Sequence, residues 1–155
     1  MNLSAHFSLR ELTKSQTATR LKLSNKPGPA ETANLKALCL NVLEPVREHY
    51  GIPFSPSSGY RCPELNKAIG SSDSSQHIKG QAADFEVPGL SNMDVAIWVL
   101  ENCSYDQLIL EFNKKKDPQS GWVNFSFVSA LKNRKKASIF DGRKWEPLLV
   151  KWTPL

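Results

Sequence analysis

Helical spacing of apolar residues dominates the first half of the chain. Between residues 31 and 50 apolar side chains recur every three or four positions, and Gly51 follows them, which predicts a long helix that ends there. Pro45 lies inside this helix and is expected to bend it, because proline has no backbone N–H to donate. Ser8 and Glu11 have the spacing of a capping box, so a short helix is expected to begin beside Ser8. Two further short helices are expected over residues 63–69 and 91–100.

Alternation of apolar and polar positions dominates the second half and predicts strands. It runs through residues 82–87, 107–112 and 122–128. Two last extended segments, 137–140 and 144–149, flank an Asp-Gly dipeptide that suits the type I′ turn of a β-hairpin. Because helices come first and strands mostly later, we expect an α+β fold, in which helices pack on one side of a small antiparallel sheet.

The composition is that of one ordinary domain. The chain has 155 residues, of which 40% are hydrophobic and 23% charged, and this excludes disordered, collagen-like and membrane-spanning classes. Its length suits a single domain over residues 1–155. Twenty Lys and Arg residues against 15 Asp and Glu residues give a net charge of +5. That excess favours anionic surroundings, such as nucleic acid, a cell wall or a membrane surface.

Cysteine usage and the N-terminal residues predict a protein made in the cytoplasm. The three cysteines are odd in number and lack Cys-x-x-Cys spacing, so neither a disulfide framework nor a cysteine zinc site is expected. The first residues lack the basic start and apolar run of a signal peptide. The sequence also has no run of about 18 apolar residues, so no membrane span is expected.

One polar stretch carries residues suited to a metal ion. His77 lies on an expected turn, and Asp84 lies on the strand that follows it. Zinc binds such nitrogen and oxygen ligands and, in catalytic sites, keeps one position for water. Taken alone, the pair is coincidental in most proteins and better suits a histidine that caps a turn and a solvated aspartate.

Four blocks of sequence follow one another in the order of a known family. They are SGYRCPELN (58–66), SQHIKGQAAD (75–84), YDQLILEF (105–112) and GWVNFS (121–126). This series resembles the zinc D-Ala-D-Ala carboxypeptidase family of murein peptidases, which is common in phages and prophages. The resemblance implies a small α+β fold, shared with the hedgehog signalling domain, whose zinc ion is held by two histidines and one aspartate. It makes His77 and Asp84 the first two ligands.

Asn124 departs from the family's pattern. The third zinc ligand of the family is the histidine of a Trp-Val-His-x-Ser block, and this chain has Asn124 in that place. Loss of a group that merely orients a ligand lowers metal affinity or activity roughly 10–100-fold, and loss of a ligand should lower it more. Three interpretations stay open: weak zinc binding through Asn124, a surrogate ligand such as His6, or a murein-binding groove without metal chemistry. His49 is expected to be a solvated residue at a helix C-terminus.

Five further residues are candidates for the chemistry. Glu111 matches a glutamate of the family and is the candidate general base, or else a residue that orients a ligand or pairs with a lysine. Arg61 is a candidate clamp for a substrate carboxylate or oxyanion, or else ties its loop to the core. Ser75 and Gln76 are candidates to hydrogen-bond substrate backbone, or else shape their turn. Trp122 is a candidate wall of the cleft, or else a packing residue.

These observations predict a zinc metallopeptidase that hydrolyses peptide bonds in peptidoglycan stem peptides, as a D-Ala-D-Ala carboxypeptidase or endopeptidase. We expect one zinc ion, weakly bound or absent, and a monomer without nucleic-acid partners that acts in phage lysis or entry. It would reach the cell wall after release, as an endolysin, or as a virion component with other phage proteins. The alternative is a catalytically impaired murein-binding or structural virion protein on the same fold, which Asn124 favours. The basic run at 132–136 is a solvated loop or a contact to an anionic envelope.

Overall fold

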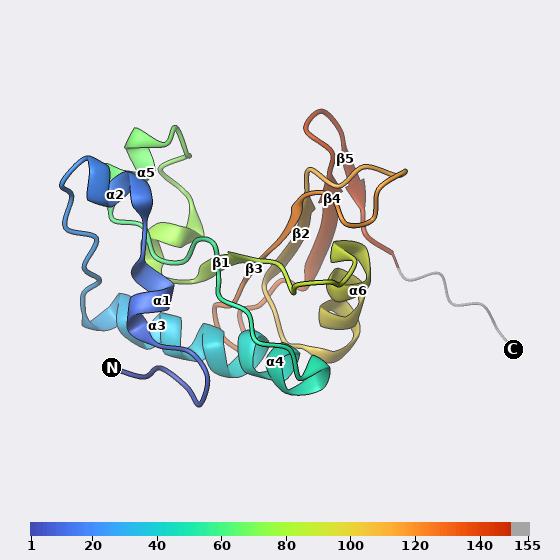
Figure 1. Cartoon of the computed structure of the whole chain (residues 1–155), viewed down its shortest axis with the longest axis horizontal. Coiled ribbons are helices and arrows are strands. Elements are labelled where there is room, and N and C mark those ends of the chain that lie inside the picture. Colours follow the sequence, from blue (N-terminus) through green and yellow to red (C-terminus); the bar gives the residue numbers. More distant parts are fainter. Residues whose placement is uncertain (150–155) are drawn as a thin grey trace, which may run out of the picture.

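Helices precede most of the strands along the chain, as the order of the patterns predicts (Figure 1). The computed structural model describes residues 1–149, so the end of the predicted domain, 150–155, lies outside the described residues. The helices are α1 (Leu9–Thr13), α2 (Gln16–Arg20), α3 (Pro29–Leu38), the π-helix η1 (Cys39–Leu43), α4 (Glu44–Tyr50), α5 (Pro63–Ala68), the 3-10 helix η2 (Gln76–Lys79) and α6 (Asn92–Asn102). The strands are β1 (Ala82–Phe85), β2 (Gln107–Glu111), β3 (Trp122–Ser126), β4 (Lys136–Phe140) and β5 (Trp145–Pro147).

Two predicted helix starts are confirmed. At α1, the Ser8 hydroxyl accepts from the Glu11 N–H at 3.2 Å, and the Glu11 carboxylate accepts from the Ser8 N–H at 2.8 Å. At α6, the Ser91 hydroxyl accepts from the Asp94 N–H at 3.3 Å. The helix α2 was not expected from the sequence. Within residues 1–149 no helix has both the length and the apolar character that crossing a membrane requires.

The long helix expected over 31–50 consists of three consecutive segments, α3, η1 and α4. It ends at Gly51, which adopts the left-handed conformation with φ 66°. The wider π-helical turn η1 lies immediately before the segment that contains Pro45. Because Pro45 has no N–H to donate to the preceding turn, this change of helical winding is where the predicted irregularity occurs.

The five strands form one mixed sheet in the order β1-β3-β2-β4-β5. β3 is antiparallel to both β1 and β2, and β5 is antiparallel to β4, but β2 and β4 are parallel. The α+β class is therefore confirmed, whereas the sheet is not wholly antiparallel. The chain leaves β3, passes β2 and begins β4 at the end of the sheet where β3 finished. β4 consequently runs opposite to β3 and in the same direction as β2.

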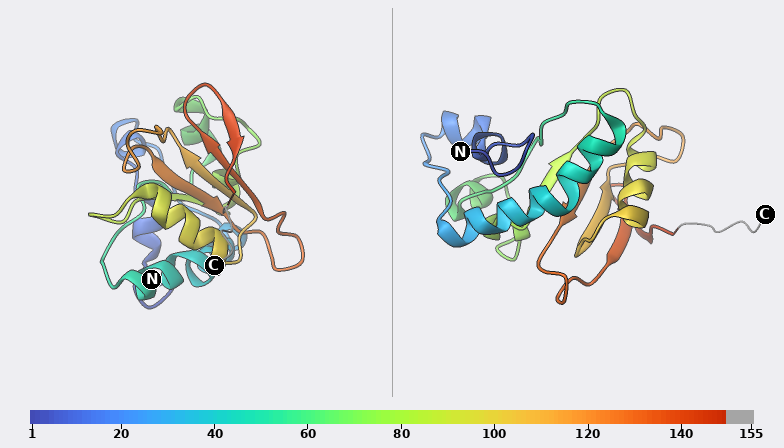
Figure 2. Two further views of the ribbon diagram at one scale, coloured as in Figure 1. Left: turned by 90° about the vertical axis from the view of Figure 1, so that its right-hand side faces the viewer. Right: turned by 90° about the horizontal axis from the view of Figure 1, so that it is seen from below.

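One face of the sheet belongs to the hydrophobic core. Leu108 and Leu110 of β2 and Val123 and Phe125 of β3 are fully buried. α6 packs against these two strands and lies on one side of the sheet (Figure 2). Because side chains alternate between the faces of a strand, the intervening residues of β2 and β3 point to the opposite face.

The predicted hairpin of β4 and β5 is present, but the predicted type I′ turn is wrong. A type I′ turn needs positive φ at both central residues, and Gly142 has φ 103° whereas Asp141 is not among the residues with positive φ. Instead, the Asp141 carboxylate accepts the N–H groups of Arg143 and Lys144, each at 2.8 Å. This side-chain turn closes a longer loop between the two strands.

Candidate functional site

Residues from three elements meet at the open face of the sheet. Asp84 of β1 lies directly opposite Asn124 of β3 in the strand pairing. The helix η2 packs against β1 and brings His77 to the same point, with its Nε2 atom 3.6 Å from Asp84 Oδ2. His77 and Asp84 are 5% and 7% exposed, so this pair of polar residues is withdrawn from bulk water. The fold therefore brings together the three residues expected as metal ligands.

The protonation of His77 follows from its contacts. Its Nδ1 atom lies 2.7 Å from the carbonyl oxygen of Gly59, which can only accept a hydrogen bond, so the proton is on Nδ1. The lone pair at Nε2 then faces the site. Burial lowers the pKa of His77, Asp84 opposes this effect, and the charge of Arg61 adds to it. The result is a neutral imidazole in the tautomer that a metal ligand requires.

Asn124 bridges the other two residues through its amide nitrogen. Nδ2 donates to Asp84 Oδ1 at 2.7 Å and lies 3.2 Å from His77 Nε2, which accepts because its lone pair faces the site. Both amide hydrogens are thereby used. The three side chains therefore form one hydrogen-bonded unit, in which the Asn124 amide nitrogen bonds both His77 and Asp84.

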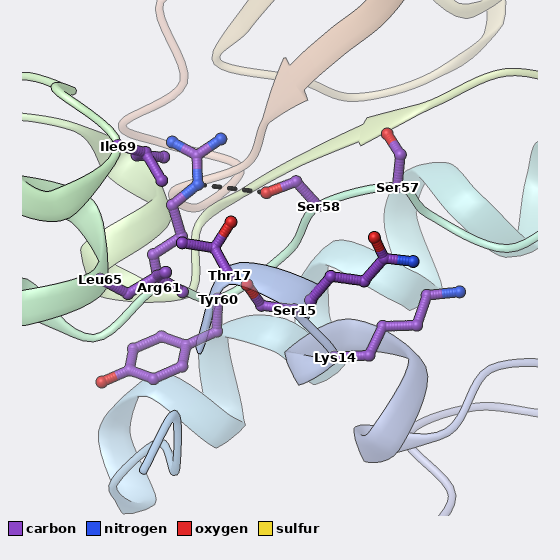
Figure 3. Close-up of a pocket in the computed structure, with 10 residues that line it drawn as sticks. Lys14, Ser15, Thr17, Ser57, Ser58, Tyr60, Arg61, Leu65 and Ile69 are labelled. Carbon is purple, nitrogen blue, oxygen red and sulfur yellow. Dashed lines mark hydrogen bonds between the residues drawn. The ribbon is translucent and has the colours of Figure 1, made fainter. Parts of the chain in front are cut away.

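Arg61 borders both the site and a neighbouring cavity. Its Nε donates to Ser58 Oγ at 3.1 Å, and one terminal nitrogen lies 3.5 Å from Asp84 Oδ2. The cavity has a volume of about 280 Å³ and is lined by Arg61, by the turn between α1 and α2, and by Ser57, Ser58 and Tyr60 (Figure 3). His77, Asp84 and Asn124 do not line it, so Arg61 is the link between this cavity and the site.

Glu111 lies at the end of β2, in register with Trp122 of β3. Burial raises the pKa of Glu111 to about 7, and the Asp84 charge adds to the rise, while Trp122 and Arg61 oppose it. The Trp122 Nε1 atom is buried and has no hydrogen-bond partner among residues 1–149, so its effect on Glu111 falls short of a well-formed hydrogen bond. Within the described residues no lysine forms an ion pair with Glu111.

Ser75 and Gln76 both make contacts within the protein. The Ser75 hydroxyl accepts from the His77 N–H at 3.3 Å and so caps the helix that carries the imidazole. The Gln76 amide donates to Asp106 Oδ2 at 2.9 Å. These bonds shape the turn that carries His77, which is the second of the two roles considered for Ser75 and Gln76. The Ser75 O–H and the Gln76 carbonyl oxygen are not used in them.

The two remaining histidines lie elsewhere. His6 Nδ1 is 2.8 Å from the Glu44 carboxylate, so the structure pairs it with Glu44 and does not bring it to Asp84. His49 stacks on Trp98, with ring centroids 4.4 Å apart. Neither histidine supplies a surrogate ligand in this arrangement.

Comparison with protein families decides the classification. The model of the peptidase M15 family matches residues 5–115, which is most of the chain. The chain belongs to the peptidase M15 family. This is the zinc D-Ala-D-Ala carboxypeptidase-like family that the four sequence blocks indicate, so the resemblance is confirmed. The matched segment includes Arg61, His77, Asp84 and Glu111 and ends before Asn124. No curated protein matches the chain.

Peptidases of the M15 family are generally zinc-dependent, and the donor atoms of this site fit zinc through His77 and Asp84. Two ligands about 2 Å from a shared tetrahedral ion lie roughly 3.3 Å apart, close to the 3.6 Å between Nε2 and Oδ2. Asn124 fits as a third ligand when its amide is turned so that Oδ1 replaces Nδ2, which gives up its bonds to Asp84 and His77. No cluster of three His, Cys, Asp or Glu side chains suited to a metal occurs within residues 1–149. The strong ligands therefore number two, and the third is an amide.

Sequence reasoning missed the groups that orient the predicted residues. Gly59 holds the His77 ring through its carbonyl oxygen, and Ser58 holds the Arg61 guanidinium. A side chain at Gly59 would also collide with the Leu12 carbonyl, because a Cβ there would lie 2.3 Å from that oxygen. The block that contains Ser58, Gly59 and Arg61 is visible in the sequence, but the contacts depend on how that segment folds over η2.

Proposed function

We propose that the chain is a zinc metallopeptidase that hydrolyses peptide bonds in peptidoglycan stem peptides, of the D-Ala-D-Ala carboxypeptidase or endopeptidase type. The observation that carries the proposal is the convergence of neutral His77, Asp84, Arg61 and Glu111 in one site of a peptidase M15 fold. His77, Asp84 and Asn124, with its amide turned, would hold the ion. Zinc bound there supplies a water of lowered pKa and polarises the scissile carbonyl.

The remaining steps belong to side chains of the chain itself. With a pKa of about 7, the Glu111 carboxyl group is present in both forms near neutral pH, so it can accept a proton from water and return it to the leaving amine. The Arg61 guanidinium binds a terminal carboxylate of the substrate in the cavity that it borders. Trp122, paired with Glu111 across the two strands, forms a wall of the cleft beside the proposed base.

The biological setting follows from the substrate. A monomer that acts on murein in phage lysis, as an endolysin released to the wall, or in entry, as a virion component, is consistent with the net charge of +5. Ser75 and Gln76 keep a substrate-binding role through the hydroxyl proton and carbonyl oxygen that their internal bonds leave unused.

The test is metal analysis of protein purified without chelator, followed by digestion of purified murein with mass spectrometry of the products. We expect less than one zinc per chain, rising on addition of zinc, and release of D-alanine or of shortened stem peptides. Glu111→Gln is the matched control, since it removes the proposed base and keeps the proposed ligands; it should bind zinc and release no product. Folded protein that takes up no zinc from an excess and yields no product would contradict the proposal.

A second candidate is a murein-binding protein without metal chemistry. The hydrogen bonds from Asn124 to His77 and Asp84 favour it, because they complete the site without any cation. This candidate predicts binding to murein sacculi that chelators leave unchanged, with no hydrolysis at any zinc concentration. Loss of binding on chelation, or any zinc-dependent hydrolysis, excludes it.

A further inference from the structure

One row of side chains runs across the whole sheet from the candidate site. Asp84 of β1 is paired with Asn124 of β3, and Asn124 is paired with Ile109 of β2. Ile109 is paired with Ser138 of β4, and Ser138 with Pro147 of β5. Paired residues of adjacent strands point to the same face, so all five lie on the face of the site. With strands about 4.8 Å apart, Ser138 lies roughly 10 Å from Asn124 along this row.

The far end of the row forms part of a groove of about 480 Å³. It lies over β2, β4 and β5, at the end of the sheet remote from β1 (Figure 1). Its lining on this face consists of Gln107, Ile109, Lys136, Ser138, Trp145 and Pro147. Because Ile109 lines the groove and is paired with Asn124, the groove lies beside the candidate site on the same face of the sheet.

A second row places aromatic rings beside Glu111. Glu111 is paired with Trp122 of β3 and with Phe140 of β4, and Phe140 is paired with Trp145 of β5. The Phe140 and Trp145 rings are stacked, with centroids 4.7 Å apart, and Trp145 remains 60% exposed. One wall of the groove is therefore an accessible indole ring supported from behind by a second ring.

Phe112 joins these rings across the end of β2. Its ring centroid is 5.0 Å from that of Trp122 and 5.5 Å from that of Phe140, and the side chain is 44% exposed. It has φ 54°, a conformation that is an outlier for a bulky residue. Such strain persists where surrounding structure enforces it and is frequent at ligand sites. The strained residue follows directly after the proposed general base and keeps the aromatic row continuous.

We infer that this groove binds a sugar ring of the glycan strand that carries the stem peptide, an inference that rests on the proposed murein substrate. The flat Trp145 ring matches the C–H face of a pyranose. The Gln107 amide, the Ser138 hydroxyl and the Lys136 ammonium group supply hydrogen bonds for sugar hydroxyl, acetamido and carboxyl groups. The separation of about 10–14 Å from Asn124 to Ser138 and Pro147 leaves room for three to four residues of extended peptide between the scissile bond and the sugar.

The test is an NMR titration of the full chain with peptide-free glycan fragments of peptidoglycan, and separately with free stem peptide. The indole N–H signal of Trp145 is identified by its loss in Trp145→Phe. We expect the glycan fragments to shift this signal and the free peptide to leave it unchanged. Trp145→Ala should raise the Kd for glycan at least tenfold, whereas Trp145→Phe, which keeps a flat ring, should retain most of the affinity.

Two further variants keep the test decisive. Gln107→Ala alters the groove from β2 and should weaken glycan binding even where Trp145→Ala disturbs the hairpin. Leu131→Ala removes a side chain that is 99% exposed and outside the groove, so it should bind glycan like the parent chain. Each of three results overturns the inference. The first is that the chain does not bind glycan, and the second is that the Kd is unchanged in both Gln107→Ala and folded Trp145→Ala. The third is that the free peptide alone shifts the Trp145 signal. The titration needs neither zinc nor hydrolysis, so it succeeds or fails separately from the peptidase proposal.

Discussion

At the scale of single residues, Asn124 competes with any metal for its own two neighbours. Its amide nitrogen donates to Asp84 and to His77, and an ion between those residues must replace both hydrogen bonds. The amide must also turn so that its oxygen faces the ion. An imidazole at this position would offer a lone pair without that rearrangement, and it is a stronger zinc ligand than a neutral amide.

Replacing Asn124 by His should therefore raise zinc affinity by at least roughly 100-fold, since a ligand is restored and a competing donor is removed. Competition with a chromophoric chelator measures this Kd. Asn124→Ala is the matched control, because it removes the competing amide without adding a ligand, and its affinity should fall below that of the Asn124→His chain. If Asn124→His binds zinc no better than the parent chain, the third ligand has been placed wrongly.

Arg61 carries a second prediction at this scale. Lysine keeps the charge of arginine but has neither its planar fork nor the Nε–H that bonds Ser58. Arg61→Lys should thus raise KM at least roughly tenfold for peptides with a free C-terminal carboxylate, by loss of a bidentate contact. KM for the same peptides with an amidated C-terminus should change little. Equal effects on both substrates would assign Arg61 to holding its loop rather than to binding substrate.

At the scale of elements, the connection between β2 and β3 positions both Glu111 and Asn124. Gly121 directly precedes β3 and has φ 73°. A Cβ at this glycine would lie 1.8 Å from the Glu111 carbonyl oxygen. The two strands approach so closely here that only glycine is accommodated, and the close approach keeps Glu111 in register with Trp122.

Gly121→Ala should lower the free energy of unfolding by about 3 kcal/mol or more, because a left-handed backbone and a collision with backbone act together. Gly70→Ala is a close control: Gly70 has φ 75° with nothing within 4 Å of an added Cβ, so its loss should be about 1 kcal/mol. Urea denaturation measures both. Equal losses in the two variants would mean that the strands separate easily at Gly121.

At the scale of the whole molecule, Asp106 connects its own segment to three others. Its carboxylate accepts from the Arg134 backbone N–H at 2.8 Å and from the Arg134 guanidinium at 2.7 and 3.0 Å. It also accepts from Gln76 of η2 at 2.9 Å and from Ser126 of β3 at 3.5 Å. Asp106 is only 1% exposed, so this junction joins the helix that bears His77 to the sheet from inside the protein.

These contacts predict how acid affects stability. The Arg134 side chain lowers the pKa of Asp106 from 3.8 to about 2. Burial opposes this effect, and hydrogen bonds from the Arg134 N–H and Gln76 add to it. Because the pKa of Asp106 is lower in the folded state, its charge stabilises the folded state at pH values above the unfolded-state pKa, by about 2 kcal/mol. This contribution is lost as pH falls from about 4 to about 2. Asp106→Asn should therefore be less stable than the parent chain at pH 7, and the difference should shrink towards pH 2.

Urea denaturation between pH 7 and pH 3 measures this difference. Asp73→Asn is the control, because Asp73 is exposed, and its stability should follow that of the parent chain at every pH. A constant difference between Asp106→Asn and the parent chain across this range would show that Asp106 acts through packing and not through its charge.

The sequence by itself determined most of the helices and strands and the family. The capping box at Ser8, the end of the long helix at Gly51 and the strands that carry Asp84 and Glu111 depend on neighbours a few positions away. Such local patterns can be recognised in the sequence because side chains repeat every 3.6 residues along a helix and every 2 residues along a strand. The likeness to a family of peptidases also followed from ordered blocks, and the M15 match confirms it.

Tertiary structure decided what these residues can do together. The parallel pairing of β4 with β2, the Asn124 amide between His77 and Asp84, and the raised pKa of Glu111 all arise from segments far apart in the chain. No periodicity encodes them, because strand order, burial and the aim of a hydrogen bond depend on how whole elements pack. His77, Asp84 and Asn124, which the sequence presents as an incomplete zinc motif, thus form one hydrogen-bonded unit in the folded chain.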